Sequence, residues 1–159
     1  MTIQTTYTQG LGTPFAGMPA DIQTSHVEYL TANAAIPFGS VVAQGSTDGR
    51  AILAVASSVL IGVAVAMNKG GDGVNASAYA QHETMGVMGF GRIFGTVVGA
   101  AGINTAAYAI PSVGATQGQF TATANALGSV GTFAATIGSD GGIVPVDIKL
   151  QTGTPTYPA

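Results

Sequence analysis

The sequence predicts an all-β protein: a single β-sandwich or barrel, with a jelly-roll-like arrangement among the options, preceded by an extended N-terminal arm. Three observations support this. The chain's 24 glycines and 7 prolines separate short apolar runs rich in Val, Ile, Ala and Thr. No run has the 3.6-residue periodicity of an amphipathic helix. The last run alternates apolar and polar residues, as expected for a strand with one buried face.

The chain of 159 residues fits one domain, and that length is sufficient to bury a core without disulfides or metals. We predict an extended arm over residues 1–25, a β-domain over 26–150 and a tail over 151–159. Glycines and prolines dominate the arm, which contains few large apolar side chains after Leu11. The tail is polar and has two prolines, so we expect it to lie outside the core.

Ten strands are predicted within the β-domain. In the last of them, Val144, Val146, Ile148 and Leu150 share the face that we expect to be buried, and the intervening residues share the other. The predicted strands cover residues 26–31, 40–44, 51–55, 61–66, 83–90, 92–98, 106–110, 119–122, 132–137 and 144–150.

The longest uncharged apolar run, residues 51–67, is the strongest candidate for a membrane span. It is shorter than the roughly 20 residues that a spanning helix needs. It also contains Ser57, Ser58 and Gly62 and is rich in β-branched residues. We therefore predict two strands around a Ser–Ser turn, and no membrane association. The first residues lack the basic start and apolar stretch of a signal peptide.

Charge is scarce: 7% of residues are charged, against about 25% in typical soluble domains. Residues 93–139 contain no charged side chain. Such a surface is poorly suited to solvent, so we expect it to contact other subunits in a homo-oligomer, either a dimer or a trimer. The four Lys and Arg residues are too few to form a basic surface for nucleic acid.

A weak internal repeat relates residues 36–66 to residues 103–135. Each segment begins with Ile followed by a polar or Gly/Ala turn and a strand, so that residues 41–42 correspond to residues 108–109. Each then has a Thr-x-Gly turn and a further strand, and Gly62 corresponds to Gly131. We interpret the segments as two similar strand–turn–strand units.

No residue pattern predicts catalysis, a cofactor or a metal. His26 and His82 lie far apart in the sequence, each near one glutamate, whereas a metal site needs at least three converging ligands. The glycines of MGFGRIFG (residues 88–95) are followed by strand-forming residues and not by the helix that a phosphate loop requires. We assign Gly89, Gly91 and Gly95 to a bulge, close backbone approach or bending of a barrel.

The arm contains the most distinctive motif, GTPFAGMPAD at residues 12–21. One interpretation is a frayed terminus. The other is a stiff strap that lies across a neighbouring protein, is ordered only there, and makes no ladder pairing with its own domain. In this second interpretation the contact residues are Pro14, Phe15, Gly17, Met18 and Pro19, with Phe15 and Met18 as anchors.

The chain resembles the structural cement, or capsid decoration, proteins of tailed bacteriophages. The likeness extends from about residue 7 to residue 150, although this chain has fewer charged turns than the family pattern. The motifs that carry it are PFAGMPAD (14–21), AAIPFGSVVAQGSTDGRA (34–51), IGVAVA (61–66), ETMGVMGFGRIFGTV (83–97), AAYAI (106–110) and VPVDIKL (144–150).

The resemblance implies a non-enzymatic virion protein that binds the outer surface of the capsid. Its partners would be the major capsid protein and further copies of itself, and it would be made in the host cytoplasm. It would cement neighbouring major-capsid subunits. The alternative is a carbohydrate- or receptor-binding β-module on a virion or cell surface. That class usually presents clustered aromatic residues, whereas this chain has no Trp and its Tyr residues are scattered.

Overall fold

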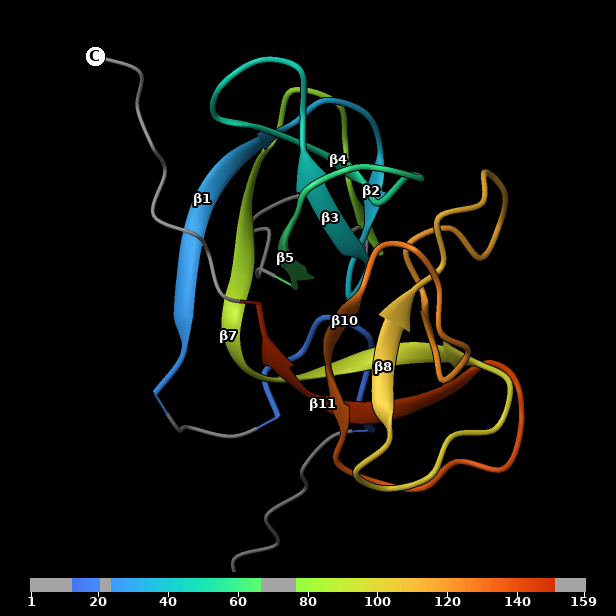
Figure 1. Ribbon diagram of the computed structural model, residues 1–159. Helices are drawn as coiled ribbons and strands as arrows, with labels where there is room; N and C mark the ends of the chain where they lie inside the picture. Colours follow the sequence, from blue (N-terminus) through green and yellow to red (C-terminus); the bar gives the residue numbers. More distant parts are fainter. Residues whose placement is uncertain (1–12, 21–23, 67–76, 151–159) are drawn as a thin grey trace, which may run out of the picture.

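The computed structural model describes residues 13–20, 24–66 and 77–150, which form strands, turns and loops without a helix. The all-β prediction is confirmed (Figure 1). The strands are β1 (His26–Ala32), β2 (Ile36–Pro37), β3 (Val41–Gln44), β4 (Arg50–Leu53), β5 (Leu60–Val65), β6 (Ala78–Tyr79), β7 (Thr84–Val98), β8 (Ala106–Ala109), β9 (Phe120–Thr121), β10 (Ser129–Phe133) and β11 (Gly142–Lys149). The predicted tail and residues 1–12 lie outside the described residues.

The strands close into two small barrels that share β7. The first barrel runs β1-β4-β3-β5-β7 and returns to β1, and the second runs β7-β11-β10-β8-β9 and returns to β7. In each barrel one parallel pair completes the ring: β1 with β4 in the first, and β7 with β9 in the second. Figure 1 shows β7 descending beside β1 and then turning to run alongside β11.

Strand β7 combines two predicted strands, residues 83–90 and 92–98, into one. Gly91 has a φ of +131°, and a Cβ there would lie 2.9 Å from the Cβ of Ser25. The ladder with β1 also has a bulge here, since His26 and Val27 face Phe90 and Met88. Glycine therefore lets β7 bend from one barrel into the other without ending, as the predicted role of Gly89 and Gly91 required.

The internal repeat is confirmed by the strand pairing. Each repeat contributes five strands, and the strands pair in the same order in both. The first repeat consists of β1, β3, β4, β5 and the first half of β7. Their counterparts in the second repeat are, in the same order, the second half of β7, β8, β9, β10 and β11. Gly62 and Gly131 each follow an extra, bulged residue, Ile61 and Val130 respectively. Val42 faces Gly62 and Ala107 faces Gly131, so Val42 corresponds to Ala107. The sequence instead matches residue 42 with residue 109, two positions farther along β8.

Both repeat glycines lie where strands approach closely. A Cβ on Gly62 would be 2.6 Å from the carbonyl oxygen of Met88, and a Cβ on Gly131 would be 1.9 Å from that of Asp147. Gly95, also predicted to allow close approach, lies against the ring of Phe120. A Cβ on Gly95 would be 2.2 Å from the Cε2 atom of that ring. Side chains at these positions would push strands apart.

Two buried clusters fill the barrels. The first barrel encloses Ala32, Ile36, Val42, Ala51, Ala64, Tyr79, Met85 and Val87. The Tyr79 hydroxyl donates to the Val65 carbonyl oxygen, and its ring packs edge-on against Phe38. The second cluster includes Phe120, Phe133 and Ile93 together with Val41 and Val63 from strands of the first barrel, so it also packs the two barrels against one another.

The predicted alternation in β11 is confirmed. Val144, Val146 and Ile148 are buried, and Leu150, just after the strand, is half-buried against the same cluster. The predicted strand 132–137 lies earlier, over Ser129–Phe133, and β2 and β6 were not predicted. Of the apolar run 51–67, the structure describes residues 51–66. They form most of β4 and all of β5 around Ser57 and Ser58, as predicted. No helix within residues 13–20, 24–66 and 77–150 is long and apolar enough to cross a membrane.

Candidate protein-binding surface

The arm pairs with its own domain. The amide of Gly17 donates to the carbonyl oxygen of Phe94 at 2.7 Å. The amide of Phe94 donates in turn to the carbonyl oxygen of Met18 at 2.9 Å. The amide of Ala20 donates to the carbonyl oxygen of Arg92, and Pro19 forms an antiparallel bridge with Ile93. The expectation that the arm makes no ladder pairing is therefore wrong. The edge of β7 opposite β11 was available there, because its pairing with β1 stops at Phe90 and its pairing with β9 starts only at Val97.

A turn precedes this pairing and presents the predicted anchor. The amide of Met18 donates to the carbonyl oxygen of Phe15, and Gly17 supplies the positive φ of +84° that the turn requires. Gly17 is buried and Met18 is half-buried. The side chains of Pro14, Phe15 and Pro19 are exposed, with 51% of Phe15 accessible. The backbone thus fixes the arm, and three of the five predicted contact residues face solvent.

The arm, β7 and β11 together form one outer surface, which we call the outer face. Residues directly opposite on paired strands lie on the same face, and successive residues alternate. Across β7 and β11, Phe90 is opposite Lys149, Arg92 opposite Asp147, Phe94 opposite Pro145 and Thr96 opposite Ile143. The bridge between Pro19 and Ile93 adds Met18 beside Phe94 and Ala20 beside Arg92.

An ion pair lies at the centre of the outer face. Arg92 Nε donates to Asp147 Oδ1 at 2.5 Å, and Arg92 Nη2 donates to Asp147 Oδ2 at 3.0 Å. This hydrogen bonding with Arg92 lowers the pKa of the Asp147 carboxyl, despite the opposing effect of its partial burial. Both side chains are about one-third exposed. The pair therefore presents a fixed, planar polar group amid apolar neighbours, a composition found at protein interfaces.

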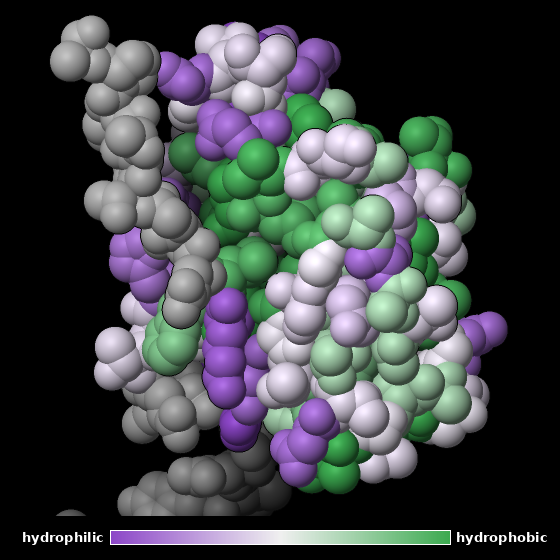
Figure 2. Space-filling view, viewed as in Figure 1, coloured by the Kyte–Doolittle hydropathy of each residue, from purple (hydrophilic) through white to green (hydrophobic). Residues whose placement is uncertain are grey.

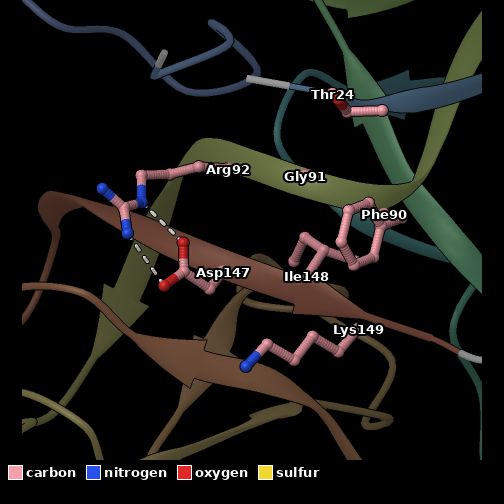
Figure 3. A pocket seen from close by; sticks show the side chains of 7 residues that line it. All are labelled: Thr24, Phe90, Gly91, Arg92, Asp147, Ile148 and Lys149. Atoms are coloured by element: carbon pink, nitrogen blue, oxygen red, sulfur yellow. Dashed lines mark hydrogen bonds and ion pairs between the residues drawn. The ribbon is translucent and has the colours of Figure 1, made fainter. Parts of the chain in front are cut away.

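A shallow depression adjoins the ion pair. It has a volume of about 150 Å³ and is lined by Thr24, Phe90, Gly91, Arg92, Asp147, Ile148 and Lys149. Figure 3 shows Arg92 and Asp147 pointing toward one another from neighbouring strands, with Phe90 and Lys149 farther along them. Ligand pockets are usually about 300–1,000 Å³. The depression suits a single side chain of another protein better than a cofactor.

Sequence reasoning identified the arm but missed the residues of β7 that complete this surface. The polar side of β11, with Pro145, Asp147 and Lys149, was recognised, but not its partners. A period-two signal was available: Phe90, Arg92 and Phe94 alternate with glycine and isoleucine inside MGFGRIFG. Assigning two separate strands there concealed that alternation.

The residues considered for chemistry do not converge. His26 lies 3.9 Å from Glu28 in an exposed pair on β1. Glu83 instead accepts a hydrogen bond from the amide of Ala80 in the turn before β7. No group of three His, Asp or Glu residues that could hold a metal occurs in the part of the chain that the structure describes.

The uncharged stretch, residues 93–139, covers much of the second barrel. Its exposed large apolar side chains include Ile103, before β8, and Val113, after β8. Figure 2 shows the surface of this barrel, at the lower right, mostly in the pale shades of small and weakly polar residues. The exposed Tyr29 and Val59 lie on the first barrel.

The fold and the outer face are those of an all-β protein whose surface suits the binding of another protein. Residues 3–149 match the family of structural cement proteins (E217 gp24/Pam3 gp6), and the chain belongs to this family. It is a virion structural protein. The resemblance noted in the sequence is therefore confirmed. No curated protein matches the chain.

Among the solved structures that share the fold are two phage proteins. One is a chain from the capsid of Myoviridae phage XM1, with a TM-score of 0.69 and 19% identity over 95% of this chain and 99% of that chain. The other is the head fibre gp8.5 N base of bacteriophage phi29, with a TM-score of 0.54 and 12% identity over 79% of this chain and 94% of that chain.

Proposed function

We propose that the chain binds the outer surface of a phage capsid and cements neighbouring copies of the major capsid protein. Family membership supports the role, and the relative from phage XM1 is itself part of a capsid. The observation that carries the proposed contact is the outer face. It places Phe90, the Arg92–Asp147 pair and the arm turn with Phe15 on one paired three-stranded backbone.

The arm turn acts as the anchor in this proposal. Phe15 is half-exposed, yet Gly17 and Met18 are hydrogen-bonded to β7 within three residues of it. An aromatic side chain on a fixed backbone loses little conformational entropy when it enters a pocket. Buried aromatic anchors are also the residues that most often dominate binding energy. Pro14 and Pro19 flank the turn, and their fixed φ angles stiffen it further.

The action is structural, without turnover. A standard protein contact buries about 1,200–2,000 Å². Repeating a contact of that size over a symmetric shell multiplies its effect, because the bound copies link subunits whose separation would otherwise be independent. The protein would thereby raise the temperature or force at which the shell opens, and it would need neither a cofactor nor nucleic acid.

Further parts of this proposal concern assembly and location. We infer that copies associate as a dimer or trimer on the particle, through the uncharged surface that includes Ile103. We also retain an arm over residues 1–25 and a tail over 151–159, with residues 13–20 docked on the domain. Synthesis would take place in the host cytoplasm, before attachment to the outside of the capsid.

The direct test uses particles that lack this protein. Purified protein added to such particles should co-sediment with them at a fixed ratio and raise the temperature at which they release their contents. An unrelated β-protein of similar size controls for non-specific adsorption. Failure to co-sediment at micromolar concentration would contradict the proposal.

A further inference from the structure

The two repeats differ in the length of their first hairpin loops. In the first barrel, β3 and β4 are joined by residues 45–49, a turn closed by a hydrogen bond from the amide of Gly45 to the carbonyl oxygen of Arg50. In the second barrel, the corresponding strands β8 and β9 are joined by residues 110–119, twice that length. This longer loop projects from the body of the molecule at the right of Figure 1. The barrel fold does not need the extra length, because a five-residue turn joins the corresponding strands, β3 and β4, in the first barrel.

The long loop is held rigidly at its base. Ile110 and Gln119 extend the hairpin, since the amide of Ile110 donates to the carbonyl oxygen of Gln119 at 2.9 Å. Gln117 Nε2 donates to the carbonyl oxygen of Ala54 at 3.1 Å. The amide of Val41 donates to the carbonyl oxygen of Gly118 at 2.7 Å. The loop is therefore braced against both barrels, so its tip is pre-organised for binding.

The tip is uncharged and carries one large apolar side chain, Val113. Val113 is 88% exposed, the most accessible of the exposed large hydrophobic side chains in the described part of the chain. It lies among Ser112, Gly114, Ala115 and Thr116, which are also exposed and small. By contrast, the short turn in the first barrel carries Asp48. A single convex apolar side chain among small residues fits an apolar recess.

The chemistry of the tip argues against a second copy of this chain as its partner. A twofold contact pairs a patch with itself, and a lone convex valine has no complementary hollow within its own loop. The depression on the outer face carries Arg92, Asp147 and Lys149, and covering those charges with an uncharged loop would cost desolvation energy. The partner surface must instead offer an uncharged hollow.

We propose that the β8–β9 loop is a second docking element, which seats Val113 in an apolar recess of a capsid subunit adjacent to the one bound by the outer face. This inference rests on the proposed function and deepens it, because a cement must contact two subunits. The loop belongs to β8 and β9, whereas the outer face belongs to the arm, β7 and β11. Reinforcement would then require the loop, whereas initial attachment would require the arm.

The test separates attachment from reinforcement. Val113→Asp and Val113→Ser are compared with wild type on particles that lack this protein. Thr47→Asp is the matched control, since Thr47 is exposed in the corresponding turn of the first barrel. We expect Val113→Asp to weaken binding about tenfold, because a charge cannot enter an apolar recess. At concentrations that restore full occupancy, its particles should open at the temperature of undecorated ones, and Thr47→Asp particles should open like wild type.

Each other outcome counts against the inference. Wild-type reinforcement by Val113→Asp and Val113→Ser at matched occupancy would overturn it while leaving the proposed function intact. A change in the self-association of either variant, measured by analytical ultracentrifugation or by cross-linking on particles, would assign the loop to a second copy of this chain and also overturn it. If wild-type protein does not bind the particles, the proposed function fails, and the inference fails with it.

Discussion

Gly17 in the arm and Gly39 after β2 lie against one another, both with positive φ. A Cβ on Gly17 would be 2.9 Å from the amide nitrogen of Gly39, and a Cβ on Gly39 would be 2.7 Å from that of Gly17. On either side of this contact, the amide of Gly39 donates to the carbonyl oxygen of Ala64, and the amide of Ala66 donates to the carbonyl oxygen of Gly17. The contact locks the arm turn to the end of β5, so it helps to fix the position of Phe15.

Replacing Gly17 with alanine should therefore destabilise the protein. The new methyl group would meet backbone atoms, and the positive φ would add strain of about 1–3 kcal/mol. Gly49→Ala is the matched control, because Gly49 has a φ of +73° but open space around its Cβ position. Urea unfolding should give a larger loss of free energy of unfolding for Gly17→Ala than for Gly49→Ala. Equal losses would show that the contact with Gly39 contributes nothing.

Deleting residues 1–20 should lower the free energy of unfolding. The deletion removes the partners of the Phe94 amide and carbonyl and of the Arg92 and Ala66 backbone groups. Each buried polar group left without a partner costs about 1–3 kcal/mol, less where water replaces the arm. Chemical denaturation of the truncated protein checks this, with a deletion of residues 1–12 as the control. An unchanged unfolding midpoint after deletion of residues 1–20 would show that the arm pairing does not stabilise the domain.

The buried side of β11 should not tolerate charge. Ile148 is 1% exposed within the second cluster, so Ile148→Asp should prevent folding, because an unpaired buried carboxylate costs several kcal/mol or is forced to take up a proton. Lys149 is exposed, and Lys149→Ala should change the free energy of unfolding by no more than about 0.5 kcal/mol. Circular dichroism of both variants checks the register. Equal tolerance would contradict it.

The Arg92–Asp147 pair should make stability depend on pH in the acid range. Folding lowers the pKa of Asp147, so its stabilisation is present above the ordinary aspartate pKa of about 3.9 and is lost as the pH falls through the lower folded value. The Asp147→Asn variant lacks this titrating group. Its free energy of unfolding should therefore fall less than that of wild type as the pH is lowered below about 4. Thermal unfolding of both proteins across the acid range checks the difference. Parallel curves would contradict the assignment, and the effect should be small because the pair is partly exposed.

Several features of the fold could be predicted because they are local in the sequence. Alternation identified the buried face of β11, and the glycines of MGFGRIFG indicated bending. The repeat emerged from the spacing of turns and of Gly62 and Gly131. The pairs that close the barrels could not be predicted, because Thr31 meets Arg50 and Val97 meets Phe120 only through long-range register. Strands β2 and β6 are two residues each, too short for any periodicity.

The candidate surface could be predicted only in part, for the same reason. The prolines and Phe15 marked the arm as a binding segment, but its docking on β7 depends on a free strand edge that no local pattern reveals. Arg92 and Asp147 are joined only once β7 and β11 are paired. For the docking of the arm, the glycines of PFAG and PFGS gave a signal, since Gly17 and Gly39 are the residues that meet.

The most direct test of the account measures how much protein particles retain at limiting concentration. Phe15→Ala is compared with wild type, and Tyr29→Ala is the control, because Tyr29 is an exposed aromatic residue on the first barrel, outside the outer face. Loss of a buried aromatic anchor costs about 2 kcal/mol or more, roughly a thirtyfold weaker contact. We predict that Phe15→Ala strongly lowers occupancy while Tyr29→Ala binds like wild type. Wild-type occupancy by Phe15→Ala would contradict the claim that the arm turn anchors this protein to the capsid.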